Sequence, residues 1–398
     1  MATTSIPVLG FIWAQFSAYH VDRLEAAGRK LQGRARVLAI EVAPASHTYA
    51  WEESLDVQCT EKTRFFQNVA YEDIPAIRRF WRQLRALSRC DTVFIGIPYS
   101  TPEIIVMVCL LRLMGKTVVM MSASKFDDFP RSTLREFGKR ILLSAYSAAI
   151  VGGVRQYEYA RFLGFNKRRV LPGYNTVSMK RVRDEATKSS AGMAAFADRP
   201  FIYVGRFVAK KNIEAIIKGY ASYAARKGSR ARRFSLIGSG ALQEQLASQC
   251  QELGVAHLVD FKGFLTAREV AAELADGLAL VLVSIEEQWG LVINEALAVG
   301  LPVIASPQVG AREALVRNLV NGYVVEPRSV EAIAMAFERM DCAEGKWQEM
   351  SSQSSSRAWL ADAERFADAV ELMVFPQLKA TAAAHQDFET NILIQRQS

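Results

Sequence analysis

Short apolar runs alternate along the chain with longer stretches in which apolar residues recur every three or four positions. Short runs of this kind are typical of buried strands in a parallel sheet, and the longer period is typical of helices that cover such a sheet. The pattern predicts strands at 8–13, 35–42, 91–97, 116–121, 148–151, 168–171, 201–205, 234–237, 258–261, 279–283 and 301–305. It predicts helices at 19–31, 74–89, 102–113, 131–145, 154–163, 291–299, 330–340 and 358–373. This alternation predicts an α/β protein with two doubly wound, Rossmann-like domains.

The domain boundaries follow from length and composition. A chain of 398 residues is too long for one ordinary core, so two domains are expected. The stretch 179–200 is charged and then rich in Ser, Ala and Gly, which indicates a linker. We therefore expect an N-terminal domain over 1–178 and a C-terminal domain over 201–357. The Ser-rich run 351–356 is expected near the start of a helix, and 380–398 is expected to be a frayed tail.

Charge and cysteine content indicate the cellular compartment and the kinds of partner to expect. Five dispersed cysteines without C-x-x-C spacing indicate reduced thiols and a cytoplasmic protein. No basic segment precedes an apolar one at the N-terminus, so a secretory signal is not expected. The apolar run 104–111 is too short to span a bilayer. The net charge of +8 is compatible with an anionic substrate or an anionic membrane surface. No nucleic-acid-binding module accompanies the charge, so no nucleic acid is expected as a partner.

The stretch 284–306 carries two carboxylates eight positions apart. Glu287 lies on a loop after the strand 279–283, and Glu295 lies within the helix that follows. Open parallel sheets bind ligands at the carboxyl ends of their strands. The amides of Gly290, Leu291 and Val292 would point outward at the start of that helix, where they form an anion site. The alternative is an ordinary strand–helix–strand unit with two solvated carboxylates.

A second loop carries two cations. After the strand that ends at Gly205 come Arg206 and Lys211, before the next helix. Arginine supplies a planar fork and lysine a point charge, and positioned cations of this kind stabilise negative charge that develops during a reaction. The alternative is two solvated cations on a loop.

Glu-x₇-Glu followed by Ala-Leu-Ala-Val-Gly-Leu-Pro-Val-Ile resembles the signature of family 4 glycosyltransferases. The resemblance covers most of 91–370 and is strongest over 201–326. It implies the GT-B architecture, in which two Rossmann-like domains face each other across a cleft and the helix 358–373 packs back on the first domain. The nucleotide sugar would bind mainly to the second domain and the acceptor mainly to the first.

The resemblance also assigns roles. Glu287 would hold the hydroxyls of the donor sugar, Arg206 and Lys211 the diphosphate, and Glu295 the ribose. The nucleotide base would pack at Gly263 and Phe264. The implied reaction transfers a sugar from a UDP- or GDP-linked donor to an acceptor hydroxyl with retention of configuration, and the departing diphosphate takes the acceptor proton.

No cofactor is expected, and no metal, because the D-x-D spacing of metal-dependent sugar transferases does not occur in the chain. The family context favours a lipid-linked or cell-surface glycan intermediate as the acceptor.

Four residues are candidates for the acceptor side. Ser122, Ser124 and Asp127 follow a strand at 116–121, and this loop resembles the family's loop facing the donor sugar. The alternative for these residues is to cap the helix that begins near 132. His20 follows the first strand and would face the acceptor, with a structural or merely exposed histidine as the alternative. The first loop lacks the paired glycine of many family members.

Two other interpretations stay open from the sequence. One is another GT-B enzyme, such as a phosphorylase or a sugar-nucleotide epimerase; a phosphorylase would need a pyridoxal lysine. The other is a non-catalytic scaffold that binds nucleotide sugars, against which the intact Arg206, Lys211, Glu287 and Glu295 argue.

The helix predicted over 74–89 contains a basic amphipathic stretch at 77–89. Arg78, Arg82, Arg85 and Arg89 fall on one side of it, and apolar residues occupy an adjoining face. Helices of this kind lie on anionic lipid. The sequence therefore predicts a cytoplasmic protein with possible peripheral binding to the inner face of a membrane, and the alternative is a core-packed helix with a solvated basic face.

Overall fold

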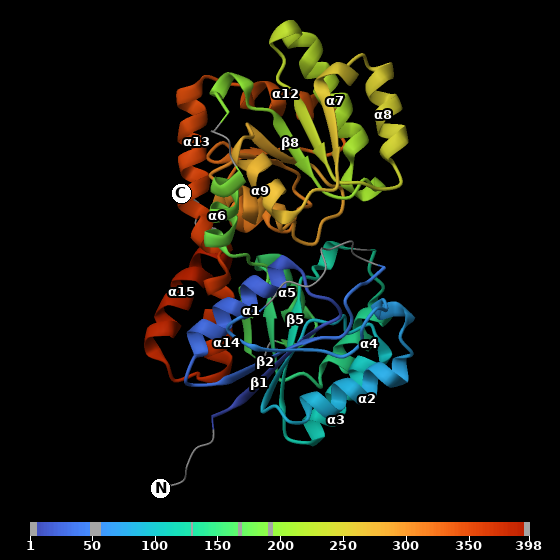
Figure 1. The fold of residues 1–398 in the computed structure, drawn as a ribbon, viewed down its shortest axis with the longest axis vertical. Coiled ribbons are helices and arrows are strands. Elements are labelled where there is room, and N and C mark those ends of the chain that lie inside the picture. Colours follow the sequence, from blue (N-terminus) through green and yellow to red (C-terminus); the bar gives the residue numbers. More distant parts are fainter. Residues whose placement is uncertain (1–5, 48–56, 129, 166–168, 190–193, 394–398) are drawn as a thin grey trace. The chain divides into compact units, whose positions relative to one another are not determined.

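The computed structural model describes residues 6–47, 57–128, 130–165, 169–189 and 194–393. The chain forms two compact units (Figure 1). The first runs to Ser178 and resumes at Ala363, and the second comprises Met179–Asp362. Within the described residues no helix combines the length and apolar character that crossing a bilayer requires. All five cysteines are free.

The first unit is a parallel sheet of seven strands in the order β3-β2-β1-β4-β5-β6-β7. The strands are β1 Val8–Trp13, β2 Arg36–Glu41, β3 Glu61–Arg64, β4 Thr92–Ile95, β5 Thr117–Ser122, β6 Ala148–Val151 and β7 Arg169–Pro172. The helices are α1 Ala18–Leu31, α2 Ala76–Leu87, α3 Pro102–Leu113, α4 Thr133–Leu143, α5 Val154–Phe162, α14 Ala363–Val374 and α15 Lys379–Leu393, with short 3₁₀ turns η1 Tyr71–Asp73 and η2 Phe126–Asp128.

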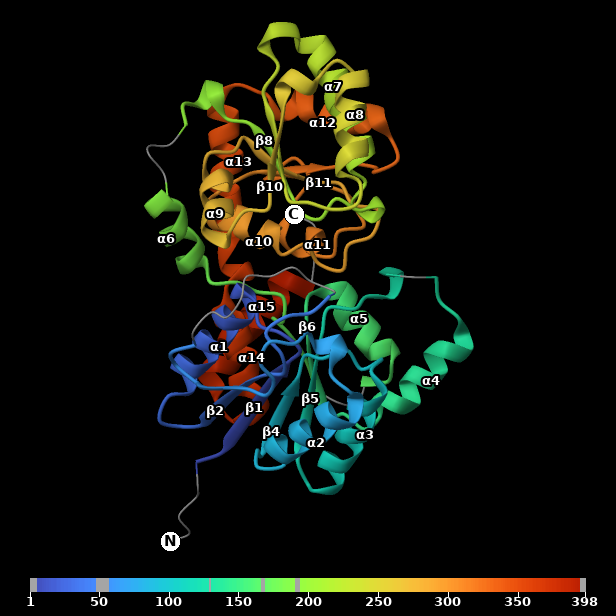
Figure 2. The same cartoon turned by 45° about the vertical axis from the view of Figure 1, so that its right-hand side comes forward.

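Helices cover both faces of this sheet (Figure 2). Phe11 and Trp13 of β1 lie in an apolar cluster with residues of α1 and α14, whereas Ile12 between them lies in a second cluster with residues of α2, α3, α4 and α5. Successive side chains of a strand point to opposite faces, so each strand contributes to both layers. This is why the strands read as short, continuous apolar runs.

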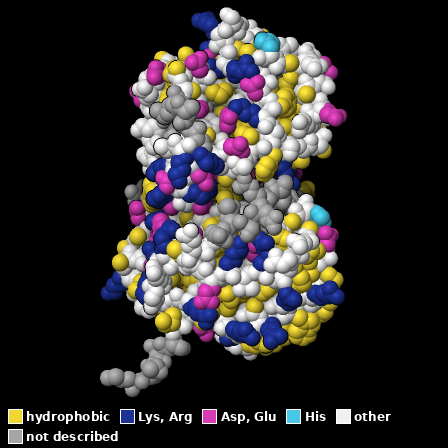
Figure 3. Space-filling view, viewed as in Figure 1, with side chains coloured by type: hydrophobic (Ala, Val, Ile, Leu, Met, Phe, Trp, Pro, Cys, Tyr) yellow, Lys and Arg dark blue, Asp and Glu magenta, His cyan; other side chains and the backbone are white. Residues whose placement is uncertain are grey.

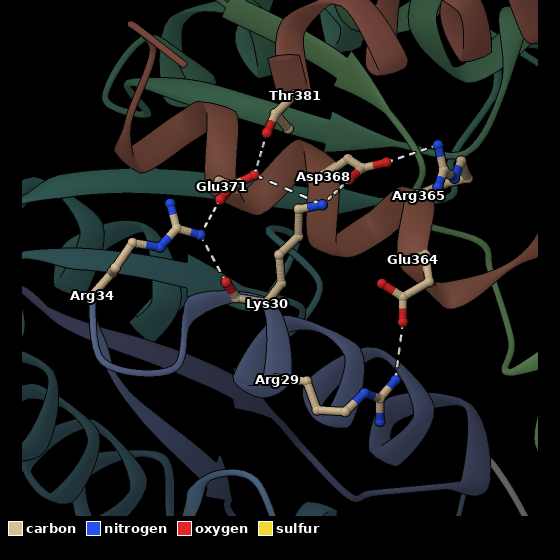
Figure 4. Close-up of polar contacts among 8 residues, drawn as sticks. All are labelled: Arg29, Lys30, Arg34, Glu364, Arg365, Asp368, Glu371 and Thr381. Carbon is tan, nitrogen blue, oxygen red and sulfur yellow. Dashed lines mark hydrogen bonds and ion pairs between the residues drawn. The ribbon is translucent and has the colours of Figure 1, made fainter. Parts of the chain in front are cut away.

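Ion pairs fasten the returning helix α14 to α1 (Figure 4). The Lys30 ammonium lies 2.5 Å from Asp368, and Arg34 pairs with Glu371. Both carboxylates are almost fully buried. Burial would raise the pKa of the Glu371 carboxyl, but the Thr381 hydroxyl of α15 and the Arg34 and Lys30 cations lower it below its ordinary value. The C-terminal helices therefore belong to the first unit.

The second unit is a parallel sheet of six strands in the order β10-β9-β8-β11-β12-β13. The strands are β8 Phe201–Val204, β9 Phe234–Ile237, β10 Val259–Gly263, β11 Ala279–Leu282, β12 Val303–Ala305 and β13 Gly322–Val324. The helices are α6 Met179–Ser189, α7 Ile213–Lys227, α8 Gln243–Glu252, α9 Ala267–Ala275, α10 Val292–Ala298, α11 Arg312–Leu315, α12 Val330–Met340 and α13 Glu344–Arg357, with 3₁₀ turns η4 Phe196–Asp198, η5 Ala209–Lys211, η6 Gly228–Arg230, η7 Ala256–Leu258 and η8 Ala358–Ala361.

The strand order of the second sheet places β8 directly beside β11. From β8 the chain proceeds through β9 and β10 in one direction, and it then resumes at β11 on the other side of β8. Loops at the carboxyl ends of the two strands flank the point where the strand order reverses, which is where open α/β sheets bind ligands. Both predicted doubly wound sheets are thus present, each with such a switch point.

Three predicted boundaries were wrong. The linker predicted over 179–200 begins with helix α6, because Met179, Val182 and Ala186 form a buried face; 190–193 lie outside the described residues. The helix predicted over 358–373 is divided into η8 and α14. The predicted tail begins with α15, which buries Phe388 and Ile392, and 394–398 lie outside the described residues.

Candidate functional site

The loops after β8 and β11 are tied together at the carboxyl edge of the second sheet. The backbone amides of Ile285 and Glu286 both donate to the carbonyl of Lys210, at 2.9 and 3.3 Å. Beside this junction the Lys211 ammonium pairs with the Glu287 carboxylate, and each of the two side chains is 14% exposed. The structure thus brings together two candidate residues that are 76 positions apart in the sequence.

Asn212 locks the start of α7 behind this ion pair. It adopts a left-handed conformation with φ of 60°. Its side-chain amide donates to the carbonyls of Val283, at 3.1 Å, and Pro327, at 2.7 Å. One side chain therefore joins the loops that follow β8, β11 and β13. Sequence reasoning missed this residue; an Asn directly after two lysines at a helix start is the available signal, because Asn tolerates the left-handed region.

We predict that Asn212→Gly and Asn212→Ala both destabilise the second unit and weaken nucleotide binding, alanine more strongly. Glycine keeps the left-handed backbone and loses only the two amide contacts, which costs about 1–3 kcal/mol. Alanine also strains the backbone by roughly 1 kcal/mol. Urea unfolding of both variants checks this order. A glycine variant as stable as the parent would show that the two amide contacts contribute nothing.

Arg206 is exposed on the same loop as Lys211. Its carbonyl accepts a hydrogen bond of 3.1 Å from the hydroxyl of Tyr203, a side chain that is completely buried. Burial raises the pKa of that phenol well above its ordinary value, and the Glu287 charge raises it further. Tyr203 therefore stays a neutral donor that fixes the backbone below Arg206.

Glu295 lies in the first turn of α10 and is 4% exposed. The loop before it turns at Gly290, where φ is 95° and an added Cβ would meet the Leu282 side chain at 2.8 Å. The indole of buried Trp289 donates to Asn294 Oδ1 at 3.0 Å, which fixes the loop against the helix. The predicted glycine is thus required by the turn itself.

The amides predicted to form an anion site begin this helix. Within the described residues, the amides of Gly290, Leu291 and Val292 donate no hydrogen bond to another backbone carbonyl, and Ile293 is the first donor, to the Gly290 carbonyl at 2.9 Å.

The predicted base-binding residues lie at the end of β10 in the same unit. Gly263 ends the strand with φ of 69°, and its carbonyl accepts from the Gly238 amide at 2.8 Å. Phe264 is 57% exposed, so its ring is available for stacking. A Cβ on Gly238 would meet the Gly205 carbonyl oxygen at 2.1 Å, so only glycine lets the loops after β8 and β9 approach this closely.

The acceptor-side candidates lie in the first unit. Ser122 ends β5, and its hydroxyl accepts from the Ser124 amide at 3.2 Å. Asp127 in η2 is held by Lys125 at 3.1 Å and by Arg155 at 3.0 Å. Lys125, which is 1% exposed, also pairs with the neighbouring buried aspartate. Sequence reasoning missed Lys125 and Arg155, which shape this loop.

His20 lies in the first turn of α1, and it is 7% exposed. Its Nδ1 accepts a hydrogen bond of 3.0 Å from the Ser17 amide, and its ring centroid lies 4.9 Å from that of Trp13. Burial, assisted by the Arg23 charge, holds its pKa well below the ordinary value. The geometry gives this histidine a capping role, and contact with an acceptor stays a prediction.

The described residues contain no group of three His, Cys, Asp or Glu side chains that could hold a metal ion. Arg78, Arg82 and Arg85 of α2 are exposed, and so is Arg89, which lies two residues beyond the end of this helix. The adjoining apolar face divides: Leu84 and Leu87 are buried, whereas Ile77 and Trp81 are about 60% exposed.

Part of the chain matches a known family. The model of glycosyl transferases group 1 matches residues 195–353, which contain Arg206, Lys211, Glu287 and Glu295. Residues 195–353 belong to that family. The resemblance to family 4 glycosyltransferases, drawn from the two motifs, is thereby confirmed.

Two curated relatives illustrate the extent of the match. An uncharacterized glycosyltransferase of Methanocaldococcus jannaschii is 30% identical over 143 residues, which are 36% of this chain and 36% of the relative. The lipopolysaccharide 1,6-galactosyltransferase of Salmonella typhimurium is 24% identical over 260 residues, which are 63% of this chain and 68% of the relative. The chain thus spans about a third of the first relative and two thirds of the second.

Among solved structures, HepE of Anabaena in complex with UDP and glucose superposes with a TM-score of 0.69. The match covers 92% of this chain and 99% of HepE at 16% sequence identity. At that identity the likeness concerns the fold. The predicted GT-B fold class is confirmed.

Proposed function

We propose that this protein is a retaining glycosyltransferase that moves a sugar from a nucleotide sugar to an acceptor hydroxyl. The observation that carries the proposal is the junction of the β8 and β11 loops. There Lys211 pairs with Glu287, with Arg206 on the same loop and Glu295 in the following helix, all inside the group 1 family domain.

The chemistry of each side chain supports its assigned role. Arg206 and Lys211 present positive charge where a nucleoside diphosphate leaves, and charge fixed in advance stabilises a developing anion. Glu287 pairs with the Lys211 ammonium, and its carboxylate oxygens can accept hydrogen bonds from the sugar hydroxyls. Glu295 accepts from the ribose hydroxyls, and exposed Phe264 stacks on the base.

The proposed step balances without a protein nucleophile. The bond from the anomeric carbon to the diphosphate oxygen breaks with its electron pair on that oxygen. The acceptor oxygen bonds to the anomeric carbon from the same face, and its proton passes to the departing diphosphate. When the donor is UDP-linked, the two products are UDP and the acceptor that carries the transferred sugar.

Incubation of the purified protein with UDP- and GDP-sugars tests this function. We expect release of the nucleoside diphosphate at a rate that EDTA leaves largely unchanged, because cations of the chain replace a metal at the diphosphate. Loss of activity in EDTA that magnesium or manganese restores would contradict the metal-free mechanism. Failure to bind or turn over any of these donors would overturn the proposed function.

Glu295→Ala is expected to weaken nucleotide binding about tenfold to a hundredfold, because a hydrogen bond to a charged acceptor contributes about 1.5–3 kcal/mol. Calorimetric titration with UDP and GDP measures the loss. Glu286→Ala is the matched control, since Glu286 is an exposed glutamate on the loop that precedes the same helix. An unchanged dissociation constant for the Glu295 variant would remove this residue from the site.

The acceptor is proposed to be a lipid-linked or cell-surface glycan intermediate. The name of the Salmonella typhimurium relative, a lipopolysaccharide galactosyltransferase, supports this choice. The exposed arginines of α2 also support it, because a basic helix face is attracted to anionic lipid. The protein would then act from the cytoplasmic side, bound peripherally to the membrane that carries its acceptor.

A further inference from the structure

Helix α4 presents its apolar side to solvent. Leu134, Phe137 and Ile141 are 81%, 61% and 58% exposed, and at spacings of three and four residues they form a single stripe. A surface helix ordinarily turns such a stripe toward the core. The buried residues of α4 are instead Glu136 and Leu143.

A polar network holds the helix in this orientation. Glu136 accepts from Lys139 at 2.7 Å, from the Tyr159 hydroxyl at 2.7 Å and from Arg131 at 3.4 Å. Burial would raise the pKa of the Glu136 carboxyl, but these partners lower it below its ordinary value. The inner side of α4 is therefore fixed by a satisfied carboxylate, so the outward stripe is part of the fold.

Two further exposed aromatic rings lie around Tyr159, whose hydroxyl donates to the buried Glu136 of α4. Phe126 of η2 and Phe162 of α5 are 50% and 54% exposed, and their ring centroids lie 5.5 Å apart. Both rings lie near Tyr159, at 6.0 and 6.4 Å between centroids. We call the stripe formed by Leu134, Phe137 and Ile141 the α4 apolar surface. An exposed stripe of large apolar side chains of this kind marks an interaction site.

The charges around this surface select the partner. Arg135, Arg140 and Arg161 are exposed. Of the acids on η2, α4 and α5, Asp127 and Glu136 are paired with cations of the same unit, and Glu158 is exposed beside Arg161. Figure 3 shows hydrophobic side chains beside Lys and Arg over the lower right of the first unit, where Figure 1 labels α2, α3 and α4. In a two-fold dimer formed through this surface, the arginines of one copy would face those of the other, which is unfavourable. An anionic bilayer offers both apolar depth and negative charge.

We infer that the α4 apolar surface inserts into the interface of an anionic membrane. Leu84 and Leu87 of α2 share a buried apolar cluster with Leu143 of α4, so both helices cover the same face of the first sheet. The outer side of α2 carries an open groove of about 530 Å³ lined by Phe66, Ile77, Arg78, Trp81 and Arg82. Apolar insertion by α4 and electrostatic attraction by α2 are the two forces that bind interfacial helices.

The inference rests on the proposed function for its biological meaning. Phe126 directly precedes Asp127, on the loop after β5 that carries the acceptor-side candidates Ser122 and Ser124. Arg131 donates both to the Phe126 carbonyl on that loop and to Glu136 of α4. Insertion of α4 would therefore hold the loop near the membrane surface, which is where the sugar end of a lipid-linked acceptor projects.

Co-sedimentation with vesicles of phosphatidylglycerol and phosphatidylcholine in equal parts tests the docking. The unmodified protein should bind at low salt and retain part of its binding at high salt, since salt screens only the charged contribution. Changing Leu134, Phe137 and Ile141 together to Ser should lower the partition coefficient about tenfold or more and remove the salt-resistant part. Changing Arg78, Arg82, Arg85 and Arg89 to Gln should reduce mainly the low-salt binding.

The matched control changes Leu253 and Met335, two exposed apolar residues of the second unit, to Ser, and it should bind vesicles like the parent. Phe137→Trp keeps the stripe apolar, and its added fluorescence should shift to the blue with vesicles and be quenched by brominated lipid. UDP binding is measured on every variant.

Failure of the parent to bind vesicles, unchanged binding by the triple variant, or an added fluorescence in Phe137→Trp that brominated lipid does not quench would each overturn the inference. A dimer of the parent that the triple variant loses would also overturn it, because a second copy would then occupy the surface. If the parent binds UDP but not vesicles, the docking fails and the proposed function stands. If it binds vesicles but no nucleotide, the docking stands and the proposed function fails.

Discussion

Lys211→Ala is expected to lower the rate of sugar transfer about a hundredfold to a thousandfold, a loss typical of removing one group that stabilises charge in the transition state. Lys211 lies where the diphosphate of the donor is proposed to leave, and charge accumulates on that group as the bond breaks. Alanine also leaves the Glu287 carboxylate without its ammonium partner beside the departing anion. Both effects grow toward the transition state, so kcat should fall more than KM rises.

Nucleotide binding separates this role from general damage to the site. Lys211→Ala should weaken UDP more than UMP, because its charge acts on the second phosphate. Lys210→Ala is the matched control: Lys210 is the adjacent exposed lysine, and its backbone carbonyl, which alanine retains, makes the loop contacts. Equal losses for UDP and UMP, or equal effects of the two lysine variants on transfer, would contradict the assignment.

A double-mutant cycle tests whether the ion pair acts as a unit. Glu287→Gln should itself slow transfer, since a neutral amide holds the sugar hydroxyls less strongly. The two changes together should cost less than the sum of the separate losses, because residues in direct contact are not additive. Strict additivity would show that Lys211 and Glu287 act independently, and the pairing seen in the protein would then be incidental to the reaction.

The alternation of elements could be predicted because parallel strands are buried on both faces and so leave apolar runs in the sequence. β3 shows where that signal fails. Its sequence, Glu-Lys-Thr-Arg, is charged, yet it pairs with β2 at the edge of the first sheet. Arg64 pairs at 2.8 Å with Glu41, which is completely buried, so ion pairing replaces apolar burial in this strand. A hydrophobic pattern cannot reveal an edge strand of this kind.

Two other predictions from the sequence, for 179–200 and for 351–356, also differ from the structure. α6 buries Met179, Val182 and Ala186, at spacings of three and four, which is a helical face within a stretch whose composition suggested a linker. The Ser-rich run 351–356 ends α13 rather than starting a helix. An added Cβ on Gly300 would meet the Ser355 hydroxyl at 2.5 Å, so small side chains are needed there for close packing, not for capping.

The candidate site was only partly readable from the sequence. The alternation of strands and helices placed Arg206, Lys211 and Glu287 on loops that follow strands, and Glu295 in the helix after the second loop. It could not show that Lys211 and Glu287 touch, since that contact depends on β8 and β11 being neighbours in the sheet. Nor could it reveal the orientation of α4, which is set by a buried carboxylate network.

Acidification is expected to destabilise the first unit through His385. This residue of α15 is 2% exposed, and its ring nitrogens make no hydrogen bond within the described residues. Burial, opposed by the Asp368 charge and assisted by the Arg365 and Arg169 charges, lowers its pKa to about 4. Between the ordinary value of about 6.5 and about 4, the unfolded chain binds a proton that the folded chain does not. Stability therefore falls as the pH falls through this window.

Two neighbouring carboxyls, those of Glu389 and Glu371, also change how the stability of the first unit depends on pH. Burial raises the pKa of Glu389, whose carboxylate lies 3.7 Å from His385 Nε2, so its protonation in the folded state opposes the histidine as the pH falls. Glu371 has a lowered pKa and therefore adds to the loss only below the ordinary range of a glutamate. The effect of His385 on stability is therefore best measured between about pH 6.5 and 5.

His385→Leu removes the titrating group and fills its site with apolar volume. At about pH 5 the histidine costs the parent about 2 kcal/mol relative to about pH 7.5, from about 1.4 kcal/mol for each pH unit of the window. The variant should lose that much less stability over the same interval, as measured by urea unfolding at both pH values. His257→Leu, at an exposed histidine of the second unit, is the control and should keep the pH dependence of the parent. If His385→Leu and the parent lose equal stability over this interval, His385 does not stay neutral in the folded protein, and the acid sensitivity of this unit has another source.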